Sequence, residues 1–161
     1  MADHSVILLA EDREDDIIMI QRAFSLAGIP NPVHVVRDGE QVLAYLKGEG
    51  TYANRDEYPL PDLLLLDLQM PRMDGFEVLR WIRDQLHLST LRIVVLTSST
   101  DMRDINVAYR LGASSFMVKP IDFQDLIHLA KVLTQFWLHL SETPTTFRYP
   151  PDRHKKRDPK R

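Results

Sequence analysis

Cysteine is absent from the sequence of 161 residues, which excludes disulfide bonds, thiolate metal sites and cysteine nucleophiles. Long hydrophobic runs are also absent: the apolar runs of this sequence are all much shorter than the roughly 20 residues that a membrane-spanning helix needs. The first apolar run is short and no basic segment precedes it, so the start of the chain does not resemble a secretion signal. From these absences we expect a cytoplasmic protein without membrane association.

Charge of one sign is not in large excess either, because the formal net charge is only -3 at pH 7. Residues 142–161 hold seven Lys or Arg and three Asp or Glu, a net +4, which leaves -7 for residues 1–141. An acidic body does not favour a dedicated nucleic-acid binder. The basic stretch 153–161 lacks interleaved aromatic residues that would stack on bases. We expect one domain over residues 1–141 and a basic, proline-containing tail over residues 142–161.

Short apolar runs alternate five times with amphipathic segments. Strands are expected at 5–10, 33–36, 62–67, 92–97 and 115–118. Helices are expected at 17–27, 39–47, 76–86, 101–111 and 123–140. Continuously apolar strands separated by helices predict an α/β fold in which a parallel sheet is covered on both faces. Five such units predict a doubly wound sheet with the strand order 2-1-3-4-5.

Polar residues follow four of the expected strands. Glu11 and Asp12 follow the first strand, Asp67 and Thr97 end the third and fourth, and Lys119 follows the fifth. Taken singly, each has an ordinary role such as a helix cap or a solvated side chain. In an open α/β sheet, however, ligands bind beyond the carboxyl ends of the strands. The arrival of these residues at one edge, from four separate parts of the chain, therefore predicts a common site.

The chemistry of these side chains indicates a divalent cation and phosphoryl transfer. Mg²⁺ prefers one or two carboxylates with carbonyl and water oxygens, which Asp12, Asp67 and a backbone carbonyl after Asp67 would supply, with Glu11 binding through water. An aspartate can act as a nucleophile and form an aspartyl-phosphate. The transferred group needs charge neutralisation, which Lys119 and the cation would provide, and Thr97 would offer a hydroxyl to a phosphoryl oxygen.

At this point the sequence resembles the receiver domain of the response regulators of two-component signalling. The matching segments are "AED" (10–12), "LLLLDLQMPRMDGFEVL" (63–79), "VVLTSS" (94–99) and "GASSFMVKP" (112–120). They occur in the family's order and spacing, and the resemblance extends over residues 5–140. It implies a flavodoxin-like (βα)5 fold and a receiver domain over residues 1–141. It also implies a partner, a sensor histidine kinase whose phosphohistidine donates the phosphoryl group.

The resemblance also implies the ligands of the cation. Asp67 would be the phosphoacceptor, and the metal site would consist of Glu11, Asp12, Asp67 and the backbone carbonyl of Gln69. The cation would be Mg²⁺, with Mn²⁺ or Ca²⁺ as substitutes.

Three further positions belong to the switch that the resemblance implies. Thr97 would be the switch hydroxyl and Lys119 the lysine that pairs with the phosphate. The bond between Lys119 and Pro120 is expected to be cis. Phe116 occupies the position of the switch aromatic, where tyrosine is common in the family. Phenylalanine can rotate inward but has no hydroxyl with which to form a hydrogen bond.

Two short features resemble small single-domain regulators of bacterial phytochrome-type histidine kinases. They are the long connection "GTYANRDEYP" (50–59) and the "FWLHL" ending of the last helix (136–140). We expect no output domain after that helix. The resemblance implies a signalling protein, not an enzyme, whose output is a phosphorylation-dependent change of the face formed by residues 101–111, 115–118 and 123–140. Apolar residues beyond the core stripe of the last helix predict a homodimer through that region.

Other readings of the same residues are possible. A phosphatase of the haloacid-dehalogenase type also uses an aspartate at the end of a strand. It needs a second acid two residues later, where this chain has Gln69, which cannot transfer a proton at neutral pH. A pseudo-receiver that acts only as a binding module would lose part of the site, whereas all of its principal residues are present. Nucleic-acid binding through the tail is the least favoured reading.

Overall fold

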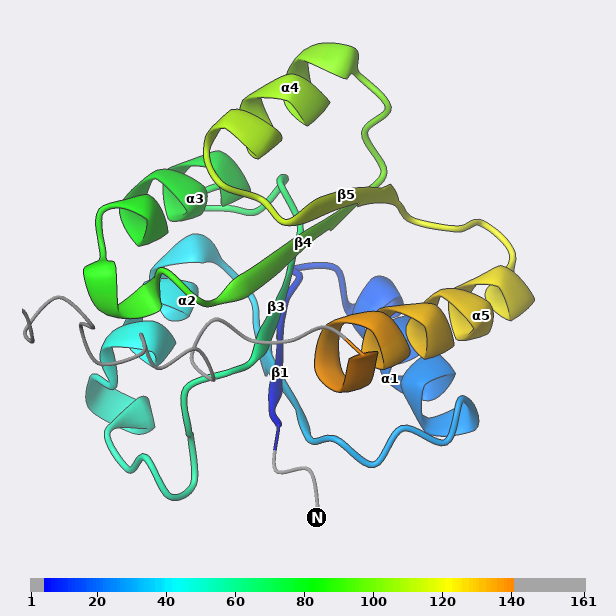
Figure 1. Cartoon of the computed structure of the whole chain (residues 1–161), viewed down its shortest axis with the longest axis horizontal. Coiled ribbons are helices and arrows are strands. Elements are labelled where there is room, and N and C mark those ends of the chain that lie inside the picture. The colour runs from blue at the N-terminus through cyan, green and yellow to red at the C-terminus, as the bar shows by residue number, and fades with distance from the viewer. Residues whose placement is uncertain (1–4, 141–161) are drawn as a thin grey trace, which may run out of the picture.

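Five parallel strands form one sheet in the order β2-β1-β3-β4-β5, as seen in the computed structural model of residues 5–140 (Figure 1). The strands are β1 (Ile7–Ala10), β2 (Val33–Val36), β3 (Leu63–Leu66), β4 (Arg92–Thr97) and β5 (Ser115–Val118). The α-helices are α1 (Glu14–Leu26), α2 (Gly39–Lys47), α3 (Gly75–Arg83), α4 (Met102–Arg110) and α5 (Phe123–Thr134). The predicted fold class and strand order are confirmed.

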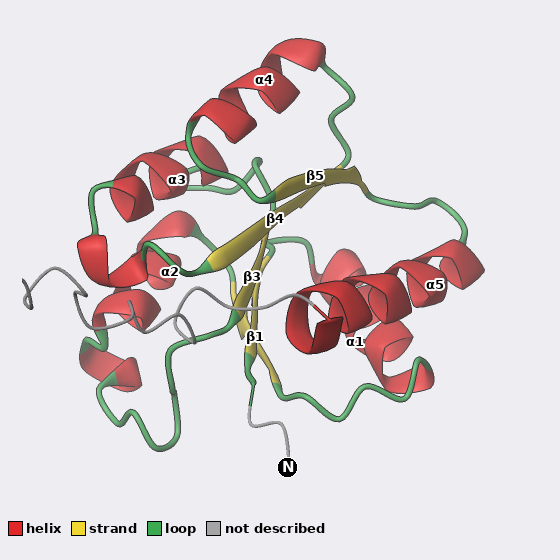
Figure 2. Cartoon of the chain, in the orientation of Figure 1, coloured by secondary structure: helices red, strands yellow, loops and turns green. Residues whose placement is uncertain are grey.

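Helices cover both faces of the sheet, so that the core has two layers (Figure 2). Helices α2, α3 and α4 pack on one face, and α1 and α5 pack on the other. The four leucines of β3 are fully buried and alternate between the two layers, with Leu64 and Leu66 in one and Leu63 and Leu65 in the other. Burial of each such side chain stabilises the fold by about 2 kcal/mol. This explains why an unbroken leucine run lies at the centre of a doubly covered sheet.

The turn after β3 is held tightly against the strand end. Asp74 and Glu77 form a capping box, in which each side chain accepts a hydrogen bond from the other's backbone N–H, so α3 starts at Gly75. The N–H of Gly75 donates to the carbonyl of Leu68 at 3.0 Å. A Cβ atom on Gly75 would lie 2.5 Å from the carbonyl oxygen of Asp67. Only glycine permits this close approach, which fixes the loop that follows Asp67.

The long connection between α2 and β3 is also anchored. It contains a 3₁₀ turn, η1 (Gly50–Tyr52). The guanidinium of Arg55 donates to the carbonyls of Tyr45 and Leu46 at the end of α2, at 2.8 and 2.7 Å, and to that of Tyr58 at 3.1 Å. Carbonyls in the last turn of a helix lack intrahelical partners, and Arg55 supplies donors to two of them; the Tyr45 carbonyl also accepts from the N–H of Gly48 at 3.1 Å.

Some element boundaries differ from the sequence expectation. The helix expected at 76–86 ends at Arg83 and is followed by a 3₁₀ turn, η2 (Leu86–Leu88). The helix expected at 123–140 is α-helical only to Thr134 and continues as a π-helix, η3 (Gln135–Leu140). The hydroxyl of Thr134 donates to the carbonyl of Ala130 at 2.8 Å. It therefore competes for a backbone acceptor at the point where the hydrogen-bond pattern changes.

The expected tail (142–161) and the end of the expected domain at residue 141 lie outside the described residues. Within residues 5–140, none of the helices has the length and apolar character needed to cross a membrane.

Candidate functional site

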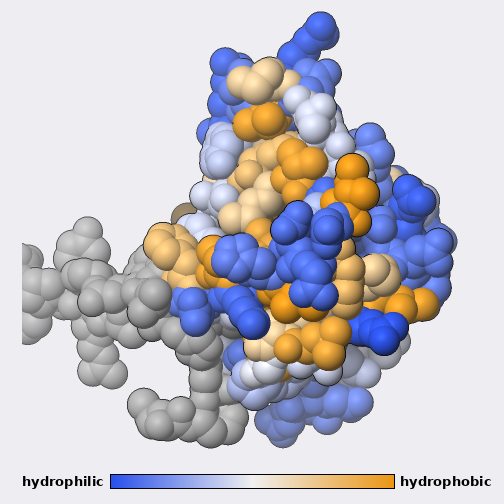
Figure 3. All heavy atoms as spheres, turned by 90° about the vertical axis from the view of Figure 1, so that its right-hand side faces the viewer, coloured by the Kyte–Doolittle hydropathy of each residue, from blue (hydrophilic) through white to orange (hydrophobic). Residues whose placement is uncertain are grey.

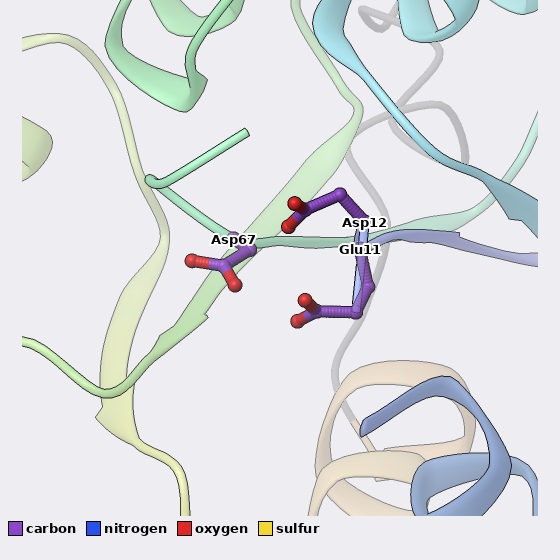
Figure 4. A group of neighbouring side chains, drawn as sticks. All are labelled: Glu11, Asp12 and Asp67. Carbon is purple, nitrogen blue, oxygen red and sulfur yellow. The ribbon is translucent and has the colours of Figure 1, made fainter. Parts of the chain in front are cut away.

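Three carboxyl groups meet at the carboxyl edge of the sheet. Glu11 and Asp12 directly follow β1 and Asp67 directly follows β3, so the parallel pairing of Ala10 with Leu66 brings them side by side. One carboxylate oxygen from each of the three residues lies within 4.8 Å of the other two (Figure 4). Glu11 and Asp67 are buried, with 1% and 5% of their surface exposed, whereas Asp12 is exposed.

Lys119 enters this cluster from the end of β5. Its ammonium group pairs with Glu11, with Asp67 at 2.9 Å and with Asp16 at 3.0 Å. The side chain of Lys119 is only 11% exposed. A buried charge is tolerated where it is paired and hydrogen-bonded. The carboxylates therefore keep the ammonium in the site, and the ammonium lets the acids lie close together.

The backbone of Lys119 is anchored as well as its side chain. Its N–H donates to the carbonyl of Thr97 at 2.8 Å, which joins the ends of β4 and β5. The expectation of a cis bond before Pro120 is wrong, because every peptide bond between residues 5 and 140 is trans. Trans is the favoured isomer even before proline, and Lys119 reaches Asp67 with the bond in this form.

Burial and mutual proximity shift the pKa values of Glu11 and Asp67 in opposite directions. Burial, together with a hydrogen bond to Asp67, raises the pKa of Glu11 from 4.5 to about 7. Burial also acts to raise the pKa of Asp67, but hydrogen bonds from Glu11, from Lys119 and from the N–H of Gln69 outweigh it, so this pKa is lowered. Near neutral pH, Glu11 thus carries the shared proton for part of the time, and Asp67 stays ionised.

The same neighbours act on the lysine. Burial alone would lower the pKa of Lys119, but the carboxyl groups of Asp67 and Glu11 raise it above its ordinary value. Lys119 is therefore positively charged at physiological pH and contributes a permanent positive charge next to Asp67.

The loop after Asp67 and the end of β4 place two further predicted residues at this edge. The N–H of Gln69 donates to Asp67 Oδ1 at 3.0 Å, while the Gln69 side chain is exposed. Thr97 is 1% exposed, and its hydroxyl oxygen accepts a hydrogen bond from the N–H of Ser99 at 3.4 Å.

Phe116 lies away from the acids, on the edge strand β5. Its side chain is half-buried and packs against the core layer beneath α2, α3 and α4. Its N–H donates to the hydroxyl of Tyr109 on α4 at 3.0 Å. A tyrosine hydroxyl is thus present at the α4–β5 contact, although it comes from the helix and not from the switch position itself.

Asp16 is the site residue that the sequence analysis missed. It lies in the first turn of α1, where Glu14 and Asp15 are acidic too, and an acidic first turn is explained by the helix dipole alone. Its spacing from Asp12, four residues, is the one available signal. The spacing indicates a contact between Asp16 and Lys119 only once α1 is known to lie beside the end of β5.

The acid cluster has the chemistry of a site for a hard divalent cation. Its ligand atoms are all carboxylate oxygens, which Mg²⁺ and Mn²⁺ prefer over nitrogen and sulfur. Two of the three carboxyl groups are held in place by burial and hydrogen bonds, and the exposed Asp12 leaves a path for water ligands. The residues present therefore fit such an ion.

The raised pKa of Glu11 predicts a pH-dependent stability of the metal-free protein. A carboxyl whose folded-state pKa is raised contributes stability that is lost as the pH rises through that pKa, here about 7. Glu11→Gln should therefore raise the melting temperature, relative to wild type, at about pH 8 and change it little at about pH 5. Thermal unfolding in EDTA measures both values. Asp15→Asn, an exposed acid on α1, is the control; an equal effect of Glu11→Gln at both pH values would contradict the assignment.

Comparison with known proteins agrees with this geometry. The family model of the response regulator receiver domain matches residues 7–131. The probable methanogenesis regulatory protein FilR2 of Methanothrix harundinacea is 36% identical over 143 residues, covering 88% of this chain and 89% of FilR2. The response regulator Rcp1 of Synechocystis sp. is 34% identical over 148 residues, covering 89% of this chain and 99% of Rcp1.

Solved structures show the same relationship. The phosphorylated cyanobacterial phytochrome response regulator RcpA superposes with a TM-score of 0.80 at 38% identity, covering 88% of this chain and 99% of RcpA. The Mn²⁺-bound form of Rcp1 superposes with a TM-score of 0.76 at 33% identity, covering 87% of this chain and 99% of that one. Receiver domains bind Mg²⁺ or Mn²⁺, and the cluster of Glu11, Asp12 and Asp67 fits that role. The chain belongs to the response regulator receiver family, and its relatives include phytochrome response regulators.

Proposed function

We propose that this receiver accepts a phosphoryl group on Asp67 from a phosphohistidine of a sensor histidine kinase of the phytochrome type. In this role it is a phosphoacceptor signalling protein and not an enzyme with a separate substrate. The observation that carries the proposal is the buried carboxylate of Asp67, which is kept ionised at the end of the central strand by Lys119 and Glu11. An ionised carboxylate is the form of aspartate that acts as a nucleophile.

The transfer requires few chemical groups. A carboxylate oxygen of Asp67 attacks phosphorus, an O–P bond forms, and the P–N bond of the phosphohistidine breaks. The electron pair of that bond returns to the imidazole nitrogen, and the proton on the other ring nitrogen of the phosphohistidine makes the leaving imidazole neutral. The phosphoryl group keeps its two negative charges, and the electron pair of the Asp67 oxygen becomes the new O–P bond. Lys119 offers its ammonium to the phosphoryl oxygens, and Thr97 offers its hydroxyl, since charge neutralisation and positioning dominate phosphoryl transfer.

The acid cluster would hold the cation in this reaction. Glu11, Asp12 and Asp67 supply carboxylate oxygens, and the Gln69 carbonyl is the proposed backbone ligand. When bound, Mg²⁺ neutralises the charge that builds up on the phosphoryl oxygens. Glu11 must give up its shared proton to take part, so its raised pKa links cation binding to the release of a proton.

A groove beside the site offers the kinase a surface to contact. Its volume is about 270 Å³, and its lining includes Asp16, Met19, Lys119, Ile121, Phe123 and Leu126. The side chain of Ile121 is fully exposed, and Met19 is 40% exposed. Hydrophobic side chains stand among charged ones on this side of the molecule (Figure 3). Exposed apolar surface that adjoins a reactive group is typical of a partner-binding site, and the relationship to Rcp1 and RcpA supports a phytochrome-type kinase as that partner.

The proposed output is a change of the α4–β5–α5 face. Helix α4 is lightly attached, because Ala108 is its one buried residue. Hydrogen bonds join it to neighbouring segments. The N–H of Phe116 donates to the Tyr109 hydroxyl at 3.0 Å, and the Ser99 hydroxyl donates to Asp104 at 2.7 Å. An element with so few buried contacts moves at low cost in free energy. Movement of Thr97 toward a phosphoryl group would vacate space into which Phe116 rotates.

We propose that the exposed side of the last helix binds a second copy of this chain. Phe136 is 52% exposed and Val132 is 42% exposed. The Phe136 ring packs edge-on against Trp137, with centroids 4.9 Å apart, so the two rings form one surface. A two-fold dimer would bury this patch against itself. The basic tail over residues 142–161, which lies outside the described residues, would add charge complementary to the acidic body of the partner.

Labelling with a small phosphodonor tests the phosphoacceptor. Wild-type protein incubated with acetyl phosphate and Mg²⁺ should gain one phosphoryl group by intact mass and lose it on treatment with hydroxylamine, as an acyl phosphate does. Asp67→Asn should fold normally and gain none, because an amide is not a nucleophile at this pH. Asp62→Asn changes the acid at the opposite end of β3 and should still be labelled. Labelling of Asp67→Asn would refute the assignment, and an unlabelled wild type would identify a pseudo-receiver.

Cation binding should depend on the exposed acid of the cluster. Asp12→Ala removes one of three carboxylates and should weaken Mg²⁺ binding at least about tenfold, since 1.4 kcal/mol corresponds to a factor of ten. Isothermal titration calorimetry measures the dissociation constant, and circular dichroism checks that the fold is intact. Asp15→Ala, which removes an exposed acid outside the cluster, should have a much smaller effect. Equal affinities of wild type and Asp12→Ala would exclude Asp12 as a ligand.

Self-association should depend on Phe136. Sedimentation velocity at tens of micromolar should show a dimer, and Phe136→Ala should shift the population toward monomer because the patch loses its largest exposed side chain. Leu86→Ala removes an even more exposed apolar side chain (90%) between α3 and β4 and serves as the control. A strict monomer with and without phosphodonor would contradict the proposed dimer.

A further inference from the structure

The ammonium of Lys119 has every one of its hydrogen-bond donors engaged. An ammonium group carries three N–H donors, and the described residues supply three carboxylate acceptors, from Glu11, Asp16 and Asp67. To donate to a phosphoryl oxygen, Lys119 must therefore release one of these partners. Which partner is released, and which one is kept, determines where the ammonium lies during the reaction.

Asp16 differs from the other two acceptors. Glu11 and Asp67 belong to the cluster that fits the cation, and Asp67 becomes an acyl phosphate in the proposed reaction. Asp16 lies outside that cluster, on α1, with its side chain 31% exposed. It is therefore the acceptor that neither cation binding nor phosphorylation would take away from Lys119.

We propose that Asp16 is a positioning residue for Lys119, which holds the ammonium on the α1 side of the site and keeps it there when the cation and the phosphoryl group occupy Glu11 and Asp67. The inference rests on the proposed function, since it concerns the same site. Without Asp16, the ammonium has only Glu11 and Asp67 as carboxylate partners. It then competes more strongly for the two acids that the cation needs, and the oxygen of Asp67 becomes harder to free for attack.

Asp16 also contributes to the stability of α1, and the test must distinguish this structural role from the positioning of Lys119. Its carboxylate lies 3.8 Å from the guanidinium of Arg13, whose side chain is 69% exposed, and it sits in the first turn of a helix. Exposed pairs and helix-dipole interactions contribute about 1 kcal/mol or less to stability. Asp15 is the matched control, because it has the same charge in the same helical turn and is exposed.

The experiment is a double-mutant cycle in full-length protein. Mg²⁺ affinity by isothermal titration calorimetry and the initial rate of labelling by acetyl phosphate are measured for wild type, Asp16→Asn and Asp15→Asn. Asp16→Asn should weaken Mg²⁺ binding and slow labelling by at least about threefold, within the range of coupling between contacting residues. Asp15→Asn should change either quantity less than about 1.5-fold, as expected of an exposed charge. Asp16→Glu, which keeps the charge, should recover part of the loss.

The second arm repeats the Asp16→Asn and Asp15→Asn changes in a Lys119→Met background, with Mg²⁺ affinity as the readout. If Asp16 acts through Lys119, the effect of Asp16→Asn on Mg²⁺ affinity should fall to that of Asp15→Asn once the ammonium is gone. If Lys119→Met does not fold by circular dichroism, Lys119→Gln takes its place. An effect of Asp16→Asn that persists in this background, or that equals the effect of Asp15→Asn in wild type, overturns the inference. If wild type itself neither binds Mg²⁺ nor becomes labelled, the proposed function fails, and the inference fails with it.

Discussion

The ammonium of Lys119 among three carboxylates is the interaction on which the site depends. Glu11 and Asp67 are almost fully buried and adjacent, an arrangement that would be strongly unfavourable if both were ionised without a partner. Lys119 supplies the opposite charge, and a proton shared with Glu11 reduces the remaining repulsion. The outcome is one ionised carboxylate, Asp67, beside one permanent positive charge. The proposed binding of a cation and the proposed transfer of a phosphoryl group to Asp67 both depend on this balance.

The sheet makes this arrangement possible because parallel pairing brings all strand ends to one edge. Ala10 pairs with Leu66, so the residues that follow them, Glu11 and Asp67, are neighbours although they are far apart in the chain. The bond from the N–H of Lys119 to the carbonyl of Thr97 fixes the end of β5 in the same way. The buried leucines of β3 stabilise the strand whose end carries Asp67. A tightly packed strand thus lies next to the carboxylate of Asp67. The close approach of Gly75 to the carbonyl of Asp67 fixes the loop between these two residues.

Stability is unevenly distributed over the molecule, which suits a signalling role. The strands β1, β3 and β4 are fully buried, whereas α4 has a single buried residue and β5 is an edge strand with half-buried and exposed side chains. Elements with few buried contacts change conformation at the lowest cost in free energy. The site is therefore built on the most stable strands and borders the least stable elements. In the proposed switch, a change of charge at Asp67 would act through Thr97 and β5 on the α4–β5–α5 face.

The sequence by itself determined the fold class and the acids at the strand ends, because apolar runs of strand length and carboxylates that terminate them are local patterns. The strand order followed from the general topology of doubly wound sheets. The sequence also located Lys119 and Thr97, since each directly follows or ends such a run. Only the tertiary structure showed that Asp16 contacts Lys119, because this contact depends on how α1 lies against the end of β5. The raised pKa of Glu11 likewise needs burial and the neighbouring Asp67, neither of which is local. The trans bond before Pro120 differs from the expectation because the resemblance, and not the local sequence, implied cis, whereas trans is the intrinsically favoured isomer. The π-helix after Thr134 begins where the Thr134 hydroxyl competes for the carbonyl of Ala130.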